Sequence, residues 1–375
     1  MTDPIHIAGA GPAGLAAAVN LAKGGYDMMV HEKNPDVGMR FNGDFQGIEN
    51  WSSETDALPF LESVGVSVNL KYNSFNRLVT FDPSGRRHVV KSRKPLFYLV
   101  ERGNGSDSLD QSLKRQAIGA GAKFILNKRA KEAKQGKVIV ATGPKVADAI
   151  AKGILFGTSY PDPAITFADN RIAPKAYACL LVSGGRATFA TCLFEDFKNA
   201  RDYFERALER MQKLVKIDIQ SPKQFGDYVN FFLRPRFKGT RFSCIGECAG
   251  LQDGPWGFGI RYAIMSGALA ARSIMRGRSY ERLARKKMSK IFEVSITDRF
   301  IFSHLGNRRY ETVLSYGDTL EDLVEWLKKW YNPSPFKTVA PQVTKRWYHS
   351  RTIVMVSDEK FNGCSHLAPQ NARGI

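Results

Sequence analysis

The sequence predicts an α/β fold in which a doubly wound domain carries an inserted domain of β-sheet and helix and is followed by a helical C-terminal region. Two observations predict the doubly wound domain. A strand, a glycine-rich turn and a helix open the chain, and a similar strand, glycine segment and helix recur from residue 241. The third observation is the length of 375 residues. Because one hydrophobic core rarely grows beyond about 250 to 300 residues, we expect two substructures.

The positions of the two glycine segments set the expected domain boundaries. The doubly wound domain is expected to be discontinuous, because its closing strand and helix come late in the chain. In chain order, the prediction assigns 1–150 with 241–280 to the doubly wound domain, 45–100 being partly on the substrate side, 151–240 to the substrate domain, 281–356 to the helical C-terminal region and 357–375 to a tail.

The composition is that of a folded protein with a surplus of positive charge. Hydrophobic residues make up 43% of the chain, which excludes a disordered protein. The 55 basic and 36 acidic residues leave a net charge of +19, spread over the whole chain rather than gathered in one segment. An even surplus argues against a nucleic-acid site, and we expect no nucleic-acid partner. It suits attraction to an acidic redox partner protein or to an anionic membrane surface.

Cysteine usage and the N-terminus indicate the cytoplasm. The five cysteines form no CxxC pair and have no histidine at metal-ligand spacing, which argues against a disulfide framework and a zinc site. No signal peptide opens the chain, and no apolar stretch approaches the roughly 18 residues that a membrane span needs. We expect a cytoplasmic protein without a metal ion, with peripheral membrane attachment as an alternative.

The first chemical motif is a glycine turn between a β-branched strand and an alanine-rich helix. Gly9 allows the tight turn, Gly11 lets the backbone approach a pyrophosphate, and Gly14 lets helix and strand pack closely. With Pro12 and Ala13 they form the start of the helix, whose free N–H groups favour an anion. The motif predicts a Rossmann-type domain that binds a dinucleotide.

An acid at the end of the second strand narrows the choice of cofactor. Glu32 lies 23 residues after Gly9, where a carboxylate hydrogen-bonds ribose hydroxyls and repels a 2′-phosphate. The bound dinucleotide is therefore expected to be FAD or NAD rather than NADP. The neighbouring Lys33 is counted among the expected cofactor-binding residues.

A second motif, in residues 241–275, favours FAD. A strand is followed by Gly-Glu-Cys-Ala-Gly, then by a glycine-rich loop and a helix of small residues. This segment resembles the distal FAD signature of the flavoproteins that include geranylgeranyl reductases, p-hydroxybenzoate hydroxylase-like monooxygenases and flavin-dependent halogenases. The cofactor-binding residues that the resemblance implies here are Gly246, Glu247, Gly254, Gly257, Phe258, Gly259 and Ile260.

The resemblance implies a role for each part of this segment. The acid binds ribitol hydroxyls; the family usually has Asp where this chain has Glu247, one methylene longer. The glycine loop brings the helix N-terminus to the isoalloxazine ring, where it stabilises the negative charge of reduced flavin. Trp256 lies inside this loop and is expected to border the substrate cavity.

Weaker matches lie between the two motifs. Arg102 follows an apolar strand and precedes a helix, and in the resembling proteins such an Arg lies near the FAD phosphates. Gly143 ends the Ala-Thr-Gly segment that returns the chain to the FAD domain. Arg40, on a loop after the second strand, is expected to contact FAD phosphate or ribose, with a solvated Arg as the alternative.

Absent motifs indicate a branch of this group. The D-G-x-x-S-x-x-R element of aromatic hydroxylases and the W-x-W-x-I-P element of halogenases are missing. The remaining resemblance, to geranylgeranyl reductases, implies reduction of double bonds in an isoprenoid or other apolar substrate through flavin N5. The alternatives are a monooxygenase of an aromatic or polyketide-like substrate and a non-catalytic flavin- or lipid-binding protein.

The sequence assigns neither a catalytic acid or base nor an electron donor. Since only one glycine-rich dinucleotide motif is present, NAD(P)H would bind transiently, and ferredoxin is an equal candidate.

The remaining segments predict local structures. Two strands are expected around Gly184-Gly185, and an amphipathic helix over 199–215 with Tyr203, Leu208, Met211 and Leu214 as core positions.

A second helix is expected over 320–331, started by a capping box at 318–321. Its apolar face is expected to pack against the substrate domain, or to dock on a membrane or partner. That face comprises Leu323, Val324, Trp326, Leu327 and Trp330, opposite Lys328 and Lys329.

Overall fold

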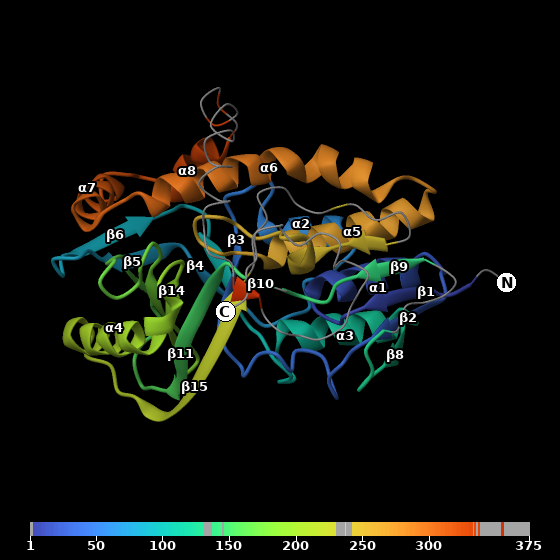
Figure 1. The fold of residues 1–375 in the computed structure, drawn as a ribbon, viewed down its shortest axis with the longest axis horizontal. Helices are drawn as coiled ribbons and strands as arrows, with labels where there is room; N and C mark the ends of the chain where they lie inside the picture. The colour runs from blue at the N-terminus through green and yellow to red at the C-terminus, as the bar shows by residue number, and fades with distance from the viewer. Residues whose placement is uncertain are drawn as a thin grey trace.

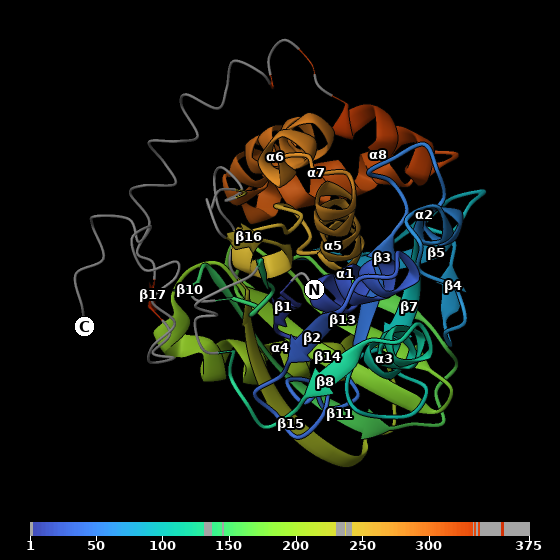
Figure 2. The same ribbon diagram turned by 90° about the vertical axis from the view of Figure 1, so that its right-hand side faces the viewer.

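The computed structural model describes residues 3–130, 137–144, 146–229, 237, 242–332, 334, 337 and 354–355. The predicted tail at 357–375 lies outside the described residues. The described parts form three sheets of three or more strands and one two-stranded sheet, with helices packed around them (Figures 1 and 2).

A five-stranded parallel sheet confirms the prediction of a doubly wound domain. Its order is β16-β9-β1-β2-β8, which places the late strand β16 beside strands of the first half. The strands are β1 (Ile5–Ala8), β2 (Met28–His31), β8 (Lys123–Ile125), β9 (Val138–Val140) and β16 (Phe242–Cys244).

Helices α1 (Pro12–Lys23), α3 (Leu109–Gly119) and α5 (Ile260–Met275) pack on this sheet and on one another. The α1–α5 contact is close because a Cβ at Gly267 would lie only 2.1 Å from the carbonyl oxygen of Ala13. The two predicted glycine segments therefore lie side by side.

A seven-stranded sheet forms the second large body, with the order β15-β11-β14-β13-β12-β5-β6. Its strands are β5 (Arg77–Phe81), β6 (Arg87–Lys91), β11 (Ala149–Gly157), β12 (Ala164–Phe167), β13 (Ala178–Ser183), β14 (Arg186–Leu193) and β15 (Gln220–Val229). The short 3-10 helix η1 (Phe197–Asn199) and the longer helix α4 (Ala200–Leu214) follow β14, and α4 covers one face of the sheet (Figure 1).

The predicted hairpin is present, since β13 and β14 pair around Gly184 and Gly185, both with positive φ. The predicted core face of α4 is wrong in part. Met211 is buried as expected, but Phe204 and Ala207 are its buried companions. Tyr203 instead turns outward and donates its hydroxyl proton to Asp196, because its ring lies under the Arg206 guanidinium at the surface.

A three-stranded sheet connects the two large bodies. It consists of β3 (Phe45–Glu49), β4 (Asn73–Phe75) and β7 (Phe97–Glu101). Helix α2 (Ala57–Ser63) lies between β3 and β4 in the chain. Phe45 N–H donates to Thr188 Oγ1 of the seven-stranded sheet, while β3 also contacts α5. A two-residue pairing of β10 (Val146–Ala147) with β17 (Val354–Met355) completes the described strands.

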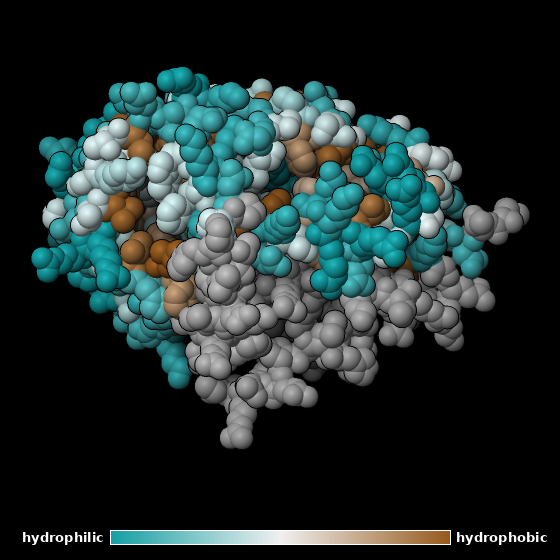
Figure 3. Space-filling model, turned by 90° about the horizontal axis from the view of Figure 1, so that it is seen from above, coloured by the Kyte–Doolittle hydropathy of each residue, from teal (hydrophilic) through white to brown (hydrophobic). Residues whose placement is uncertain are grey.

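The C-terminal region is helical as predicted, and its helices cover the top of the molecule in Figure 1. They are α6 (Tyr280–Ser303), α7 (Asn307–Gly317) and α8 (Leu323–Tyr331). Seen from above, this helical layer is largely hydrophilic, with apolar residues in small separate patches (Figure 3). Among the described residues, no helix is both long enough and apolar enough to span a membrane.

The capping box predicted at 318–321 is wrong. Helix α8 begins at Leu323, and Asp322 caps it by accepting from Glu325 N–H. Asp318 instead ends α7 and accepts hydrogen bonds from Val89 N–H and His88 Nδ1, so its carboxylate fastens α7 to β6.

The predicted division of α8 into an apolar and a basic face is also wrong in part. Val324, Leu327 and Tyr331 are buried, but so is Lys328, which forms ion pairs with Glu54 and Glu325. Trp330 lies at the surface with 39% exposure. The buried face extends to Lys328 because the Glu54 and Glu325 carboxylates compensate its charge.

Candidate functional site

The first glycine turn has the geometry that a pyrophosphate site requires. Gly9 has φ +106°, and a Cβ there would lie 2.3 Å from the carbonyl oxygen of Ala141. A Cβ at Gly14 would lie 2.0 Å from the carbonyl oxygen of Gly9. No atom lies within 4 Å of a Cβ built at Gly11, so this part of the turn faces open space. Pro12 begins α1 there, and Ala13 is buried beside it.

Glu32 is aimed at this turn from the end of β2. Its Oε2 accepts from Ala10 N–H at 3.0 Å, and its Oε1 accepts from the Asn34 backbone and side chain at 3.0 and 2.9 Å. The carboxylate is therefore fixed beside the glycine turn, where the expected ribose would lie. Lys33, next in the chain, is exposed.

Arg40 joins three segments that are far apart in the sequence. Its Nη1 donates to Glu247 Oε2 at 2.8 Å, and its Nε and Nη2 donate to Asp227 Oδ1 at 3.0 and 2.7 Å. A Cβ at Gly143, whose φ is +78°, would lie 3.8 Å from Nη1. The structure thus brings Arg40, Gly143 and Glu247 together, and it adds Asp227 of β15, which the sequence analysis missed.

Burial and charge act in opposite directions at this cluster. Burial raises the pKa of the Glu247 carboxyl above its usual value, and the Arg40 guanidinium opposes that rise. Burial disfavours the charge of Arg40, but the Glu247 and Asp227 carboxylates outweigh it and raise the pKa of Arg40. Arg40 therefore stays charged and holds an acid at the place where the sequence predicts a ribitol contact.

The distal glycine segment lies directly against the first one. It begins with the short helix η2 (Gly246–Ala249), and a Cβ at Gly246 would lie 2.7 Å from the Cβ of Ala13. Gly257 has φ +76° with no atom within 4 Å of its would-be Cβ, so it faces open space. Gly259 caps α5, and Ile260 begins that helix as a buried residue.

Three other loop residues have packing partners of their own. A Cβ at Gly254 would lie 2.4 Å from the Ser295 carbonyl oxygen, so this glycine lets the loop approach α6. Phe258 packs over Gly47 of β3 and meets the Trp51 ring edge to face at 5.0 Å. The expected flavin contacts of Gly254 and Phe258 stay predictions.

Trp256 lies between the seven-stranded sheet and α6. Its carbonyl oxygen accepts from the Tyr177 hydroxyl at 2.5 Å, and its ring lies 5.2 Å from that of Phe302. Tyr177 precedes β13 and is buried, which raises the pKa of its hydroxyl. Trp256 therefore borders the seven-stranded sheet on the face turned away from α4, and the cavity role stays a prediction.

That sheet face carries two cysteines opposite the side covered by α4. Cys179 pairs with Ala190 across β13 and β14, and Cys192 N–H donates to the Tyr177 carbonyl. Burial raises the pKa of both thiols, that of Cys192 to about 12, so they remain neutral at physiological pH. Both residues keep intermediate exposure. A neutral, small-residue surface of this kind suits an apolar ligand.

Arg102 is committed to a buried ion pair. Its Nε and Nη2 donate to the two carboxylate oxygens of Asp110 at 2.9 and 3.0 Å, and its Nη1 donates to Gln46. The guanidinium also lies 4.2 Å from the centroid of the Phe41 ring. Its first role is to fasten α3 to β7, and the predicted contact with FAD phosphates stays a prediction.

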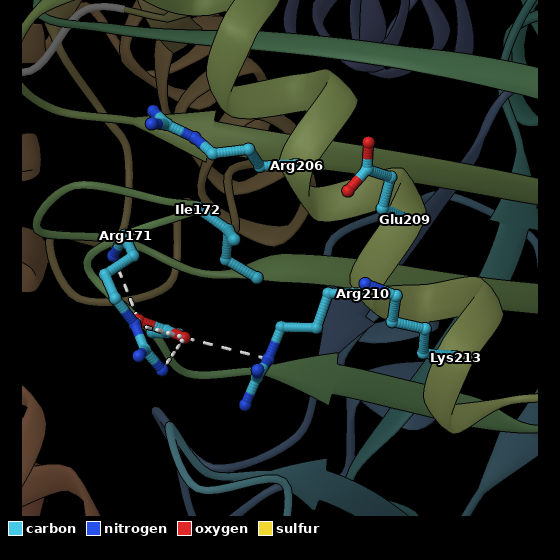
Figure 4. A pocket seen from close by; sticks show the side chains of 7 residues that line it. Arg171, Ile172, Arg206, Glu209, Arg210 and Lys213 are labelled. Carbon is cyan, nitrogen blue, oxygen red and sulfur yellow. Dashed lines mark hydrogen bonds and ion pairs between the residues drawn. The ribbon is translucent and has the colours of Figure 1, made fainter.

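A small surface hollow of about 160 Å³ lies elsewhere, on the α4 side of the seven-stranded sheet (Figure 4). Its floor is occupied by Asp169, which pairs with Arg171 and Arg210. Most of its lining is charged, and it belongs to the opposite face of the sheet from Trp256. It is therefore separate from the site described above.

Comparison with known proteins supports the fold. Residues 7–45, which include the first glycine turn and Glu32, match the model of the NAD(P)-binding Rossmann-like domain. Fold and glycine turn thus define a chain with a dinucleotide-binding domain of the Rossmann-like class.

Particular relatives cover nearly the whole chain. The sequence is 21% identical over 348 residues to digeranylgeranylglycerophospholipid reductase of Methanococcus vannielii, covering 83% of this chain and 86% of the relative. A geranylgeranyl bacteriochlorophyll reductase-like structure from Thermoplasma acidophilum has a TM-score of 0.71 at 18% identity and covers 93% of this chain and 99% of its own. A flavin-dependent brominase has a TM-score of 0.63 at 13% identity and covers 93% of this chain and 98% of its own. These structures confirm the predicted fold.

Proposed function

We propose that this protein is an FAD-dependent oxidoreductase that reduces double bonds in an isoprenoid or other apolar substrate. The observation that carries the proposal is the meeting of the two glycine segments, with Arg40 and Glu247 beside them and open space at Gly11 and Gly257. The similarity to two proteins described as geranylgeranyl-type reductases, one in sequence and one in fold, supports the substrate class.

The residues present fit FAD. Gly11 and the start of α1 would hold the pyrophosphate, Glu32 the adenosine ribose, and Glu247 with Arg40 the ribitol. The N-terminus of α5 after Gly259 would stabilise negative charge on the ring system. When bound, FAD supplies hydride transfer through N5, and the protein supplies orientation and electrostatics.

The substrate is proposed to lie between loop residues 254–260 and the sheet face that carries Cys179 and Cys192. Neutral thiols, Ala190 and the apolar parts of Tyr177 and Trp256 would line this space, and the Asp227 carboxylate near Cys192 is paired with Arg40. The electron donor is proposed to be NAD(P)H or an acidic redox protein, which the positive surface would attract.

Two experiments test the proposal in sequence. First, the purified chain is incubated with FAD and desalted; stoichiometric yellow protein that releases FAD on denaturation is expected, and a chain that retains no FAD contradicts the proposal. Second, the FAD-loaded chain is reduced with dithionite and mixed anaerobically with a geranylgeranyl lipid. Reoxidation of the flavin with a matching gain of two hydrogens in the lipid is expected.

A monooxygenase is the second candidate, because the fold is shared with a flavin-dependent brominase. The anaerobic experiment separates the two. A monooxygenase would leave the lipid unchanged without oxygen and would add an oxygen atom to an aromatic substrate in air. Unchanged substrates under both conditions would favour a binding protein.

A further inference from the structure

Asp253 is a completely buried acid at the base of the loop that faces the expected flavin. Its backbone closes the loop, since its N–H donates to the Phe258 carbonyl and its carbonyl accepts from Gly257 N–H. Its side chain points into the protein, where Oδ2 accepts from Trp256 N–H at 2.9 Å and Oδ1 accepts from the Tyr331 hydroxyl at 2.8 Å. The carboxyl therefore lies on the inner side of the loop, whereas Gly257 of the same loop faces open space.

The groups facing Asp253 come from every element packed against it. Helix α8 contributes Tyr331, β3 contributes Glu49, α5 contributes Tyr262, the segment before β13 contributes Tyr177, and α6 contributes Ser295, Asp298 and Arg299. The cations among the neighbours bind other partners. Arg299 donates to the carbonyls of Pro255 and Lys175, and Lys337 pairs with Asp298. Within the described residues, no Lys, Arg or His forms an ion pair with Asp253.

A buried carboxyl without a cation favours its neutral form. Burial raises the pKa of Asp253 to about 7, with Glu49 and Asp298 adding to the rise and the bonds from Tyr331 and Trp256 opposing it. The Tyr331 hydroxyl suits both states of the acid, because it can donate to a carboxylate or accept from a carboxylic acid. The hydrogen bond between Asp253 and Tyr331 is therefore kept in both protonation states of the acid.

We propose that Asp253 holds a proton whose uptake is linked to reduction of the flavin, so that negative charge on the cofactor and on this loop do not accumulate together. This proposal rests on the proposed function, because it requires FAD at the loop. In this step the carboxylate gains one proton from solvent and becomes a carboxylic acid. Both electrons pass from the donor to the flavin, and none passes through Asp253.

The physical reason is electrostatic. Two-electron reduction places negative charge beside the loop, in a region of low dielectric where like charges interact strongly. Asp253 already has two carboxylates near it. Protonation of Asp253 therefore stabilises the reduced state more than the oxidised state, which is the thermodynamic definition of the linkage.

The test measures the midpoint potential of the FAD-loaded protein against pH from about 5.5 to 8.5. Wild-type protein is expected to take up one more proton per two electrons than Asp253→Asn, seen as a steeper fall of the potential with pH near neutrality. Tyr331→Phe removes a bond that favours the carboxylate, so the region of steep slope should move up by about one pH unit. Asp196→Asn, at an exposed acid near α4, is the matched control and should behave like wild type.

Equal slopes in wild type and Asp253→Asn, with full FAD content in both, would overturn the proposal. A second readout does not need FAD. Infrared difference spectra of the unloaded protein between pH 6 and 8 should show a buried carboxylic acid that is absent in Asp253→Asn, and no such signal would also overturn it. A chain that binds no FAD but shows this signal contradicts the proposed function while leaving Asp253 as a proton-holding residue.

Discussion

The two glycine segments meet at one site but are held in different ways. The first, at residues 9–14, depends on backbone sterics, because Gly9, Gly14 and Ala141 approach one another too closely for side chains. The second, at residues 246–259, combines one close backbone approach, that of Gly254 to the Ser295 carbonyl oxygen, with side-chain hydrogen bonds from Tyr177, Ser295 and Tyr331. A glycine at a close backbone contact, such as Gly14, should not tolerate a side chain, whereas the loss of one side-chain bond to the distal loop should weaken the protein by degrees.

The largest expected effect comes from Gly14→Ala. Its Cβ would lie 2.0 Å from the Gly9 carbonyl oxygen, so the strand and helix must separate. We expect the free energy of unfolding to fall by about 3 kcal/mol or more, measured by urea denaturation. Gly11→Ala is the matched control, since it meets no atom within 4 Å. It should keep wild-type stability but lose FAD affinity by about tenfold or more, and wild-type affinity would place the pyrophosphate elsewhere.

Arg299→Met tests the distal loop. The guanidinium donates to the carbonyls of Pro255 and Lys175 and stacks on Phe194, so its loss leaves two buried acceptors without this donor. A decrease of about 2 to 4 kcal/mol in unfolding free energy is expected. Arg308→Met, at an exposed Arg on α7, should cost less than about 0.5 kcal/mol. Equal effects of the two variants would mean that the loop is not held from α6.

Arg40→Gln tests the cluster that joins the loop after β2 to Glu247 of the second segment and to Asp227 of β15. Removing the guanidinium leaves the negative charge of the buried Glu247 carboxylate with less compensation. The free energy of unfolding is therefore expected to fall by about 2 kcal/mol at pH 7. Because burial raises the folded-state pKa of Glu247, the associated stability is present below its ordinary value of 4.5 and is lost as pH rises through the folded value. The variant should therefore regain stability between pH 7 and pH 5, as thermal melts at the two pH values would show. A pH-independent loss would contradict this reading.

The smallest expected effect concerns the start of α8, which carries Tyr331 to Asp253. Asp322→Ala removes the cap on Glu325 N–H and should cost about 1 kcal/mol, measured by thermal unfolding. Thr319→Ala, in the segment before the helix, is the control and should change stability by less than about 0.5 kcal/mol. If the control costs more than Asp322→Ala, the helix begins where the sequence pattern placed it.

The same comparison explains what the sequence could predict. Local spacing is enough to define the turn at Gly9, Gly11 and Gly14, because its constraints lie within one strand, one turn and one helix. The α/β fold and the late return of β16 followed from the same kind of pattern. The partner of Arg40 at Asp227 is 187 residues away, and Tyr331 is 78 residues from Asp253. Hydrophobic periodicity and local motifs carry no information about partners so far apart in the chain, so these pairs could not be predicted from the sequence.

The errors have the same origin. The capping box at 318–321 had acceptable local chemistry, but His88 and Val89 of a distant strand use the Asp318 carboxylate. Tyr203 had the spacing of a core residue, but Asp196 and Arg206 offer its hydroxyl and ring better partners at the surface. In each case a tertiary contact overrode a local preference.

The central claim is that the two segments together form one FAD site, and one measurement tests it most directly. FAD binding is titrated by flavin fluorescence in wild type, Gly11→Ala and Arg40→Gln. The account predicts stoichiometric binding in wild type and weaker binding in both variants, since Gly11 belongs to the first segment and Arg40 holds Glu247 of the second. Absence of FAD binding in the wild type, or unchanged affinity in both variants, would contradict it.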